Sequence, residues 1–231
     1  MSANPTEIAF FNELAQEWWD PNGPQATLHK INPLRLRWIS QSLALKNLQV
    51  LDVGCGAGLL SEGLAKLGAQ VSGLDLAADL INVAQKHASE SKLDILYYCE
   101  DLQQFSQTHA QHFDAICCLE MLEHVDDFDA IIAQMSSCLK PGGKIFLSTI
   151  DRSPRSFIEL IVGAEYILKM VPRGTHHYAK FIRPEELCAS LRKNHLKPIE
   201  MRGLRYNLAL KTFSLTSKPA SNYMVLAERL L

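Results

Sequence analysis

Residues 48–58 read LQVLDVGCGAG, and this stretch decides the fold. The apolar run Leu48–Val53 is followed at once by glycines at 54, 56 and 58, and a helical pattern begins at Leu59. Glycines at such a turn let the backbone approach a ligand and adopt positive φ, and the start of the next helix offers free N–H groups to an anion. The stretch therefore predicts a strand, a ligand-binding turn and a helix within a parallel sheet.

The same alternation continues along the chain. Ala115–Leu119 is unbroken apolar, as expected of a strand buried on both faces. Strands separated by helices predict right-handed crossovers, and hence a Rossmann-like α/β fold with a mostly parallel, doubly wound sheet. The expected parallel strands are 48–53, 71–74, 95–99, 115–119 and 145–149, with helices at 59–67, 77–89 and 127–139 between them. A helix from Pro184 and an antiparallel pair of strands, 199–204 and 223–229, are expected to complete the fold.

Two helices are expected before the first strand. Apolar residues recur at helical spacing over 8–18. Asn32 followed by Pro33 is typical of an N-cap and a first helical residue, and predicts a second helix as far as Leu45. We expect a single domain over residues 1–231. Its parts would be a helical N-terminal cover at 1–46, the sheet, and an inserted segment at 151–183 after the fifth strand.

Composition limits the class of protein. The 231 residues are 47% hydrophobic and 21% charged, and the net charge is −2, which indicates a globular chain without a global field for nucleic acid. The N-terminus lacks the layout of a signal peptide, so we expect a cytoplasmic protein. The six cysteines form no C-x-x-C motif and are expected to be reduced and mostly buried: Cys55, Cys99, Cys117, Cys118, Cys138 and Cys188.

The glycine turn and one downstream carboxylate indicate a nucleoside cofactor. Asp75 ends the second expected strand, 21 residues after Gly54, where it can accept hydrogen bonds from both hydroxyls of a ribose. A dinucleotide-binding turn would read G-x-G-x-x-G, whereas here the third glycine comes one residue early. The spacing therefore disfavours a dehydrogenase.

These motifs resemble the class I S-adenosylmethionine-dependent methyltransferases. The D-x-G-x-G-x-G string at 52–58, the acid at Asp75 and the L-K-P-G-G turn at 139–143 all match. The resemblance implies that Gly54 and Gly56 face the methionine portion of the cofactor, that Asp75 binds the ribose and that Leu119 lies near the adenine. It also makes Asp101 a candidate for the adenine amine, although an aspartate there can equally cap a helix.

Longer strings narrow the resemblance to the ubiquinone biosynthesis O-methyltransferase family, over nearly the whole chain. The matching strings are WWD at 18–20, LHKINPLR at 28–35, EMLEHV at 120–125, GAEYIL at 163–168, VPRGTH at 171–176 and NYM at 222–224. The resemblance implies methylation of catechol-type hydroxyls on polyprenylated intermediates, at two steps of the pathway. It implies that Arg35 contacts the cofactor, and we expect this contact at the methionine carboxylate. The alternative is an arginine that lies at the surface or compensates a helix dipole. Ala57 and His177 depart from common family residues.

The expected acceptor site follows the fourth strand, in Glu120, Glu123 and His124. Two carboxylates and an imidazole within five residues can bind a hard divalent cation such as Mg²⁺. A cation on adjacent catechol oxygens would favour the phenolate, which is scarce at neutral pH because a phenol has a pKa of about 10. The alternative is that Glu123 and His124 cap a helix or pair with each other. The sequence assigns no catalytic base; His176 is a candidate or a turn residue.

The segment 151–183 has a composition suited to a lipid-like substrate. An apolar stretch at 157–171 is flanked by basic residues, six against three acidic ones over 151–183. We expect a lid that grips a prenyl tail, or a peripheral contact with anionic lipids on the inner face of the membrane. An ordinary core helix is the alternative. We also expect contact with other proteins of the same biosynthetic assembly, and no nucleic acid.

Two other functions fit parts of the pattern. A class I methyltransferase could act on another small phenol or on carbon, although carbon methylation needs no cation that chelates a catechol. A non-catalytic, S-adenosylmethionine-binding scaffold would not need the acidic cluster after the fourth strand. A single-turnover assay separates the scaffold from the enzymes. Prenyl length and oligomeric state leave no mark in the sequence.

Overall fold

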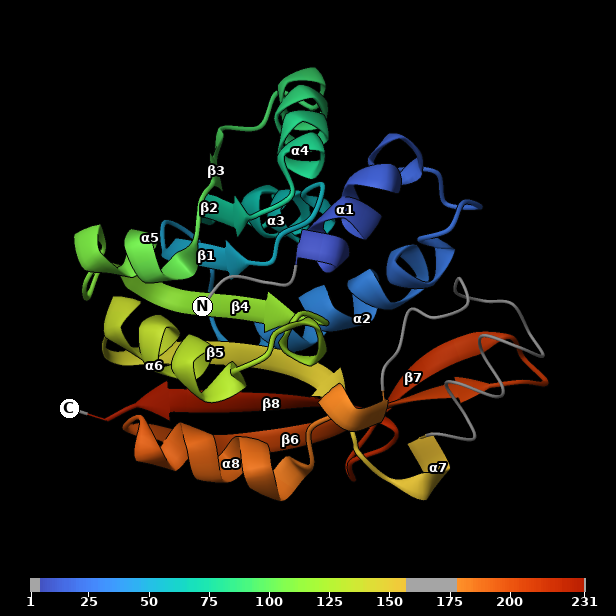
Figure 1. The fold of residues 1–231 in the computed structure, drawn as a ribbon, viewed down its shortest axis with the longest axis vertical. Helices are drawn as coiled ribbons and strands as arrows, with labels where there is room; N and C mark the ends of the chain where they lie inside the picture. Colours follow the sequence, from blue (N-terminus) through green and yellow to red (C-terminus); the bar gives the residue numbers. More distant parts are fainter. Residues whose placement is uncertain (1–4, 157–177, 231) are drawn as a thin grey trace.

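The computed structural model describes residues 5–156 and 178–230, which form one mixed sheet with helices on both faces (Figure 1). Over these residues the strand order is β3-β2-β1-β4-β5-β8-β6-β7. The strands are β1 (Gln49–Val53), β2 (Gln70–Asp75), β3 (Ile95–Cys99), β4 (Phe113–Leu119), β5 (Leu139–Ile150), β6 (Leu196–Asn207), β7 (Thr212–Thr216) and β8 (Asn222–Arg229).

The first five strands are parallel, as predicted, and β1 is central among them. β8 pairs antiparallel with both β5 and β6, which confirms the predicted antiparallel pair near the end of the chain. β7, at the edge of the sheet, is not predicted from the sequence. Its strand pattern is short, and its residues are exposed or half-buried, so it lacks the apolar alternation that marks a buried strand.

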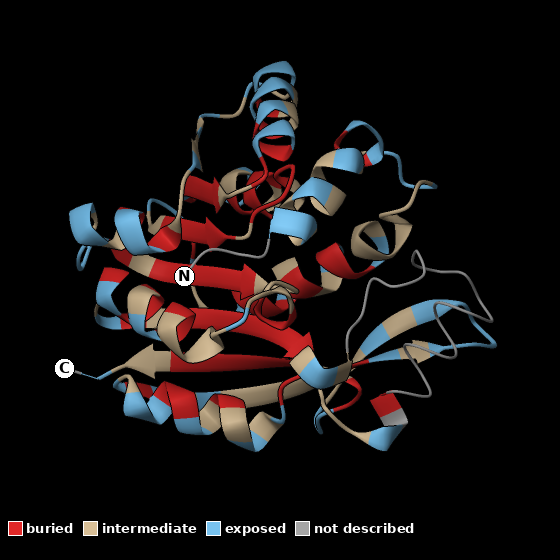
Figure 2. Cartoon of the chain, in the orientation of Figure 1, coloured by how far each residue is buried: buried red, intermediate tan, exposed pale blue. Residues whose placement is uncertain are grey.

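Helices cover the two faces of the sheet. Apolar residues from α2 and α3 pack on one face with Val50, Phe146 and Leu226, and those of α5, α6 and α8 pack on the other with Leu51 and Leu147. The strands at the centre are therefore buried on both sides (Figure 2). The helices are α1 (Pro5–Glu13), α2 (Ala26–Ser42), α3 (Leu59–Lys66), α4 (Ala78–Glu90), α5 (Leu102–Thr108), α6 (Phe128–Cys138), α7 (Pro154–Ser156) and α8 (Pro184–Lys193).

The predicted start of the second helix is wrong. α2 begins at Ala26, and Pro33 lies inside it, whereas the sequence predicted Asn32 as the N-cap. Asn32 is buried, and its Nδ2 donates to the carbonyl of Leu59 at 3.0 Å, so the side chain joins two helices instead of capping its own. Contacts with the rest of the fold therefore outweigh the local cost of a proline within a helix.

The expectation for the cysteines holds in part. None of the six forms a disulfide, and four are buried, but Cys99 is exposed and Cys188 half-buried. Most of the segment 151–183 falls on 157–177, outside the described residues. The parts that are described contain the short helix α7 and a single turn at Tyr178–Lys180.

Candidate functional site

The glycine turn is tied to the end of β2. The N–H groups of Gly54 and Cys55 donate to the carbonyl of Leu74 at 2.8 and 3.1 Å. Gly54, Gly56 and Gly58 all have positive φ, between +55° and +86°. A Cβ at Gly54 would lie 2.6 Å from Met121 Cγ, and one at Gly56 would lie 2.5 Å from Trp18 Cζ2. The turn thus needs glycine for its backbone and for the side chains packed against it.

Asp75 organises this turn. Its Oδ2 accepts from Gly56 N and its Oδ1 accepts from Ala77 N, each at 2.9 Å. Burial raises the pKa of Asp75, and these two N–H donors oppose that shift. Each carboxylate oxygen has a further lone pair, so the predicted ribose hydrogen bonds are compatible with the backbone contacts. The predicted position of Asp75, at the end of β2 beside the glycines, is confirmed.

Asp52, the first residue of the D-x-G motif, is buried beneath the turn. Its Oδ2 accepts from Ser61 Oγ at 2.6 Å. Burial raises the pKa of Asp52 to about 7; the Ser61 hydroxyl opposes the rise, and the nearby Asp75 adds to it. Asp52 therefore has a structural role, because its hydrogen bond with Ser61 anchors the start of α3 to the end of β1.

The N-terminal cover closes the turn from outside. Trp18 lies against Gly56, and Trp19 Nε1 donates to the carbonyl of Ala57 at 3.0 Å. The Trp19 ring stacks on His87 of α4, with centroids 3.5 Å apart. His87 Nδ1 in turn contacts the buried carboxylate of Glu62. The two adjacent tryptophans therefore hold the cover on the glycine turn.

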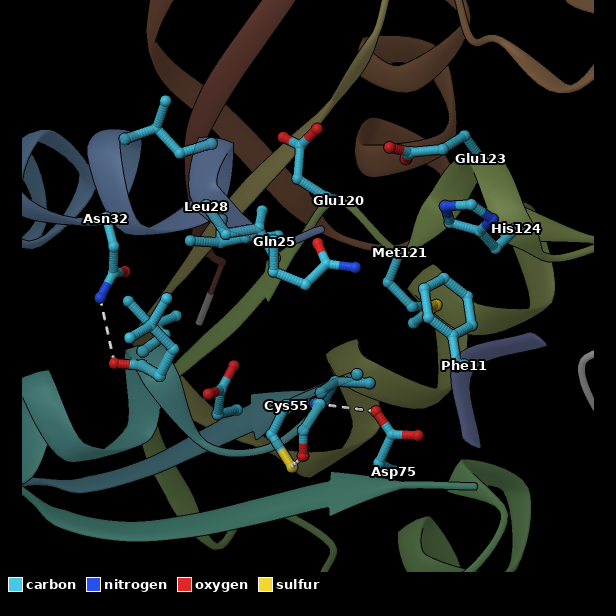
Figure 3. Close-up of a pocket in the computed structure, with 18 of the residues that line it drawn as sticks. Phe11, Gln25, Leu28, Asn32, Cys55, Asp75, Glu120, Met121, Glu123 and His124 are labelled. Carbon is cyan, nitrogen blue, oxygen red and sulfur yellow. Dashed lines mark hydrogen bonds between the residues drawn. The ribbon is translucent and has the colours of Figure 1, made fainter. Parts of the chain in front are cut away.

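A cavity of about 670 Å³ opens beside the turn, at the carboxyl ends of the parallel strands. This size is in the ordinary range for small-molecule sites. Figure 3 shows Asp75 and Cys55 on one side of it and Glu120, Glu123 and His124 on the other. Every residue predicted for the site lines the cavity: Arg35, Gly54, Gly56, Asp75, Leu119, Glu120, Glu123 and His124.

Arg35 and Glu120 form an ion pair at the cavity wall. Arg35 Nη2 donates to Glu120 Oε1 and, at 3.3 Å, to Ser148 Oγ, while its buried Nε has no hydrogen-bond partner among the described residues. Burial lowers the pKa of Arg35, and the carboxylates of Glu120 and Glu123 oppose this. A buried donor without a partner, beside the cavity, suits an anionic ligand group such as a carboxylate.

Asn222 of β8 completes this cluster and is not among the residues predicted for the site. Its Nδ2 donates to both oxygens of Glu120, at 3.0 and 2.8 Å, and Ser148 Oγ donates to Oε1 at 2.6 Å. Glu120 itself has a φ of +57°, which is costly for a residue with a side chain. Three donors therefore hold Glu120 in a strained backbone conformation. The NYM string at 222–224 marked Asn222 only as part of the family resemblance, and the fold brings it to Glu120 from 102 residues away.

Glu123 and His124 are turned toward other partners. Glu123 is buried and accepts from Thr149 Oγ1 at 2.7 Å; burial raises its pKa to about 7, and Glu120 adds to the rise. His124 Nδ1 lies 3.0 Å from Glu7 Oε2 of α1. Burial alone would lower the pKa of His124, but Glu7, Glu123 and Glu120 together raise it.

The predicted metal ligands do not converge in this arrangement. Glu120 faces Arg35 and Asn222, Glu123 faces Thr149, and His124 faces Glu7. Over the described residues, no group of three or more His, Cys, Asp or Glu side chains is arranged to hold a metal ion. As they stand, the three side chains do not fit Mg²⁺.

Two further predicted residues can be placed. Leu119 ends β4 and is half-buried at the cavity wall, as expected, while its adenine contact stays a prediction. Asp101 caps α5, since its Oδ1 accepts from Gln103 N at 2.7 Å. The capping alternative is thus confirmed, although Asp101 also lines the cavity. His176 and His177 lie outside the described residues.

Comparison with known proteins identifies the family. A family model described as a methyltransferase domain matches residues 25–200. A ubiquinone biosynthesis O-methyltransferase from Leptothrix cholodnii is 47% identical over 99% of this chain and 98% of its own length. The protein of the same name from Coxiella burnetii is 46% identical over 94% of this chain and 93% of its own length. The chain belongs to the ubiquinone biosynthesis O-methyltransferase family.

Solved structures agree with this family in fold. Magnesium protoporphyrin IX methyltransferase from Synechocystis PCC 6803, solved with bound SAH, has a TM-score of 0.71 and 19% identity. The match covers 96% of this chain and 94% of that one. The same enzyme with bound SAM has a TM-score of 0.67 over 99% of this chain and the whole of that chain, at 18% identity. The predicted class I methyltransferase fold is therefore confirmed.

Proposed function

We propose that the chain is an S-adenosylmethionine-dependent O-methyltransferase that acts on catechol-type hydroxyls of polyprenylated intermediates, at two steps of ubiquinone biosynthesis. Near-full-length identity of 44–47% with relatives named for this pathway carries the proposal. The cavity supports it, because one side offers the residues expected for the cofactor and the other offers a polar cluster with apolar surroundings. We also propose that residues 1–231 act as a single methyltransferase domain, since the cover packs directly on the glycine turn.

The cofactor side of the proposal assigns roles residue by residue. Arg35 pairs with the methionine carboxylate, for which its buried Nε is unpartnered among the described residues. Asp75 binds the ribose, Gly54 and Gly56 give the backbone room beside the methionine portion, and Leu119 packs near the adenine. When bound, S-adenosylmethionine supplies an activated methyl group to the acceptor. The protein's own task is to hold the phenolic oxygen in line with this methyl group. Such positioning can strongly accelerate methyl transfer.

In the proposed reaction, the bond between phenolic oxygen and methyl carbon would form as the bond between sulfur and methyl carbon breaks, with the electron pair of the broken bond left on sulfur and the phenolic proton passed to solvent water. The acceptor ring is proposed to lie by Glu120, Glu123 and His124, across the cavity from Asp75 (Figure 3). The many apolar side chains of the cavity exclude water from this ring, and a drier site strengthens the electrostatic influence of the polar cluster.

A role for Mg²⁺ at Glu120, Glu123 and His124 stays a prediction from the donor set and the family resemblance. Binding would require Glu120 to leave Arg35 and His124 to leave Glu7. Electron paramagnetic resonance with Mn²⁺ tests binding directly, and turnover in excess chelator tests its use. Stoichiometric Mn²⁺ binding that is lost in Glu123→Ala would support the cation. Full turnover in chelator, without Mn²⁺ binding, would remove it.

Peripheral contact with anionic lipids on the cytoplasmic face of the membrane, through 151–183, is also proposed, as is contact with other proteins of the pathway. Most of that segment lies outside the described residues, and Arg152 at its start pairs with Glu186. Across the part of the chain that the structure describes, no helix is long and apolar enough to cross a bilayer. Flotation with anionic and neutral vesicles tests the lipid contact; equal recovery with both would contradict it.

The function is tested by product analysis with a short-tailed demethylubiquinol analogue and S-adenosylmethionine. Mass spectrometry is expected to show one added methyl group on oxygen, matched by an equal amount of S-adenosylhomocysteine. Asp75→Ala is the control that removes a cofactor-side residue. Methyl transfer to carbon, or to simple phenols only, would favour the alternative of another small-molecule methyltransferase. Cofactor binding without turnover would favour a scaffold.

A further inference from the structure

The β6–β7 hairpin forms one end of the cavity that holds the candidate site. Leu204, Arg205 and Tyr206 of β6, Leu208 of the turn and Phe213 of β7 all line it. In Figure 1 the hairpin extends beyond the carboxyl ends of the parallel strands, on the side where α1 and α2 also lie. The same cavity therefore runs from the glycine turn to the β6–β7 hairpin at the edge of the sheet.

The inner face of the hairpin is apolar and aromatic. Tyr206 and Phe213 pair across the two strands, with ring centroids 4.8 Å apart. Phe10 and Phe11 of α1 line the same cavity. Aromatic surfaces of this kind gain by burying hydrocarbon. Arg205 is the one charged side chain that the hairpin adds to the cavity lining, beside four apolar or aromatic ones.

The tip of the hairpin exposes two leucines. Leu208 is 65% and Leu210 70% exposed, more than any other large hydrophobic side chain of the described residues. Leu208 also lines the cavity, so the apolar lining continues from the interior to the outer surface. An apolar lining that continues to the surface suits an apolar ligand that is longer than the cavity and extends out of it.

The tip of the hairpin is a hydrogen-bonded turn. Asn207 Oδ1 accepts from the N–H groups of Ala209 and Leu210, both at 3.0 Å. At the base of the hairpin, Thr216 Oγ1 donates to the carbonyls of Lys218 and Gly203, at 2.9 and 3.3 Å. The leucines are thus presented by a hydrogen-bonded element, which lowers the entropy lost when a ligand covers them.

We infer that the β6–β7 hairpin is the subsite for the apolar tail of the acceptor. Tyr206 and Phe213 contact the part of the tail next to the ring, and Leu208 and Leu210 cover the part that leaves the cavity. The inference rests on the proposed function, since it takes the acceptor to be an isoprenoid-substituted phenol. It assigns recognition of the tail to a described element of the sheet, where the sequence had pointed only to 151–183.

The test compares two acceptors that differ only in the tail: a catechol with two isoprene units, short enough to need no detergent or vesicle, and the same ring without them. The variant is Leu208→Ser with Leu210→Ser. Its matched control is Leu96→Ser, since Leu96 is 58% exposed on β3, at the opposite edge of the sheet. Thermal unfolding checks that both variants are folded.

The measured quantity is the ratio of kcat/KM for the tailed acceptor to kcat/KM for the tail-less one. The hairpin variant is expected to lower this ratio about tenfold or more, through KM, because the tail loses the burial of two leucines. Leu96→Ser is expected to leave the ratio unchanged. An unchanged ratio in the hairpin variant would overturn the inference. If the wild type self-associated, the variant did not, and kcat/KM fell equally for both acceptors, the leucines would form a contact between copies of the chain, which would also overturn it. If the wild type methylated neither acceptor, the proposed function itself would fail.

Discussion

The guanidinium of Arg35 in α2 is paired with the carboxylate of Glu120 at the end of β4. The first residue is expected on the cofactor side of the site and the second on the acceptor side, so this ion pair joins the two halves. From the sequence, Glu120, Glu123 and His124 were expected to serve the acceptor alone. Because Glu120 orients Arg35, removing the Glu120 carboxylate should also weaken cofactor binding.

Replacing Glu120 with alanine is expected to destabilise the protein and to weaken cofactor binding. Arg35 would remain as a buried cation without its partner, a change that costs about 3–5 kcal/mol in other proteins. Urea unfolding measures the stability, and calorimetry with S-adenosylmethionine measures the affinity. Glu120→Gln is the control, because an amide oxygen can still accept from Arg35. Wild-type stability and affinity in Glu120→Ala would show that the pair is not structural.

Replacing Asp75 with alanine is expected to lower S-adenosylmethionine affinity at least about tenfold, since hydrogen bonds to a charged acceptor contribute about 1.5–3 kcal/mol each. The variant also loses the acceptor for Gly56 N and Ala77 N. Asp75→Asn separates the two effects, because its amide oxygen can accept from one of these N–H groups while the charge is gone. Unchanged affinity in a folded Asp75→Ala protein would contradict the ribose assignment.

Comparing Gly56→Ala with Gly142→Ala separates two costs of adding a Cβ: the strain of a positive φ and the steric clash with a neighbouring side chain. Both glycines have positive φ, +55° and +76°. A Cβ at Gly142 meets nothing within 4 Å, whereas one at Gly56 would lie 2.5 Å from the buried Trp18 ring. Gly142→Ala should therefore cost about 1 kcal/mol, and Gly56→Ala about 3 kcal/mol, with lower cofactor affinity. Equal costs by urea unfolding would show that Trp18 moves aside freely.

Asp52 should make stability depend on pH. Its pKa rises on folding from 3.8 to about 7, so its contribution to stability is fully present below pH 3.8 and is lost as pH rises through 7. Asp52→Asn lacks this titration and keeps an acceptor for Ser61. The stability of the variant minus that of the wild type should therefore increase between about pH 4 and 7, and then level off. A difference that is constant across this range, measured by urea unfolding in buffers of equal ionic strength, would refute the shift.

Much of the fold could be predicted because its signals are local. The signals of three elements lie within neighbouring residues: the unbroken apolar run at Ala115–Leu119, the glycine turn, and Pro184 at the start of α8. The start of α2 could not be predicted in this way, because Asn32 donates its hydrogen bond to the carbonyl of Leu59 in another helix. β7 could not either, since an edge strand with exposed residues carries little hydrophobic pattern.

The site divides in the same way. Asp75 and the glycines belong to one continuous unit, β1–turn–α3–β2, whose length fixes their spacing. The partners of Glu120 come from α2, β5 and β8, and only the assembled sheet brings Arg35, Ser148 and Asn222 together. The metal prediction relied on three donors close in sequence. It did not anticipate that each donor would have its own partner, because spacing along the chain does not fix the direction of side chains.

The position of β8 in the sheet has a consequence for how the chain is made. β8 follows β6 and β7 in sequence but lies between β5 and β6 in space. During synthesis, the parallel part of the sheet can form while β6 and β7 can pair only with each other, because β8 joins them to β5. The hairpin can join only after β8 has left the ribosome, so the apolar end of the cavity is completed last. Until then, the edge of β5 is open to pairing with other chains, which makes this interval the one in which a chaperone would matter most.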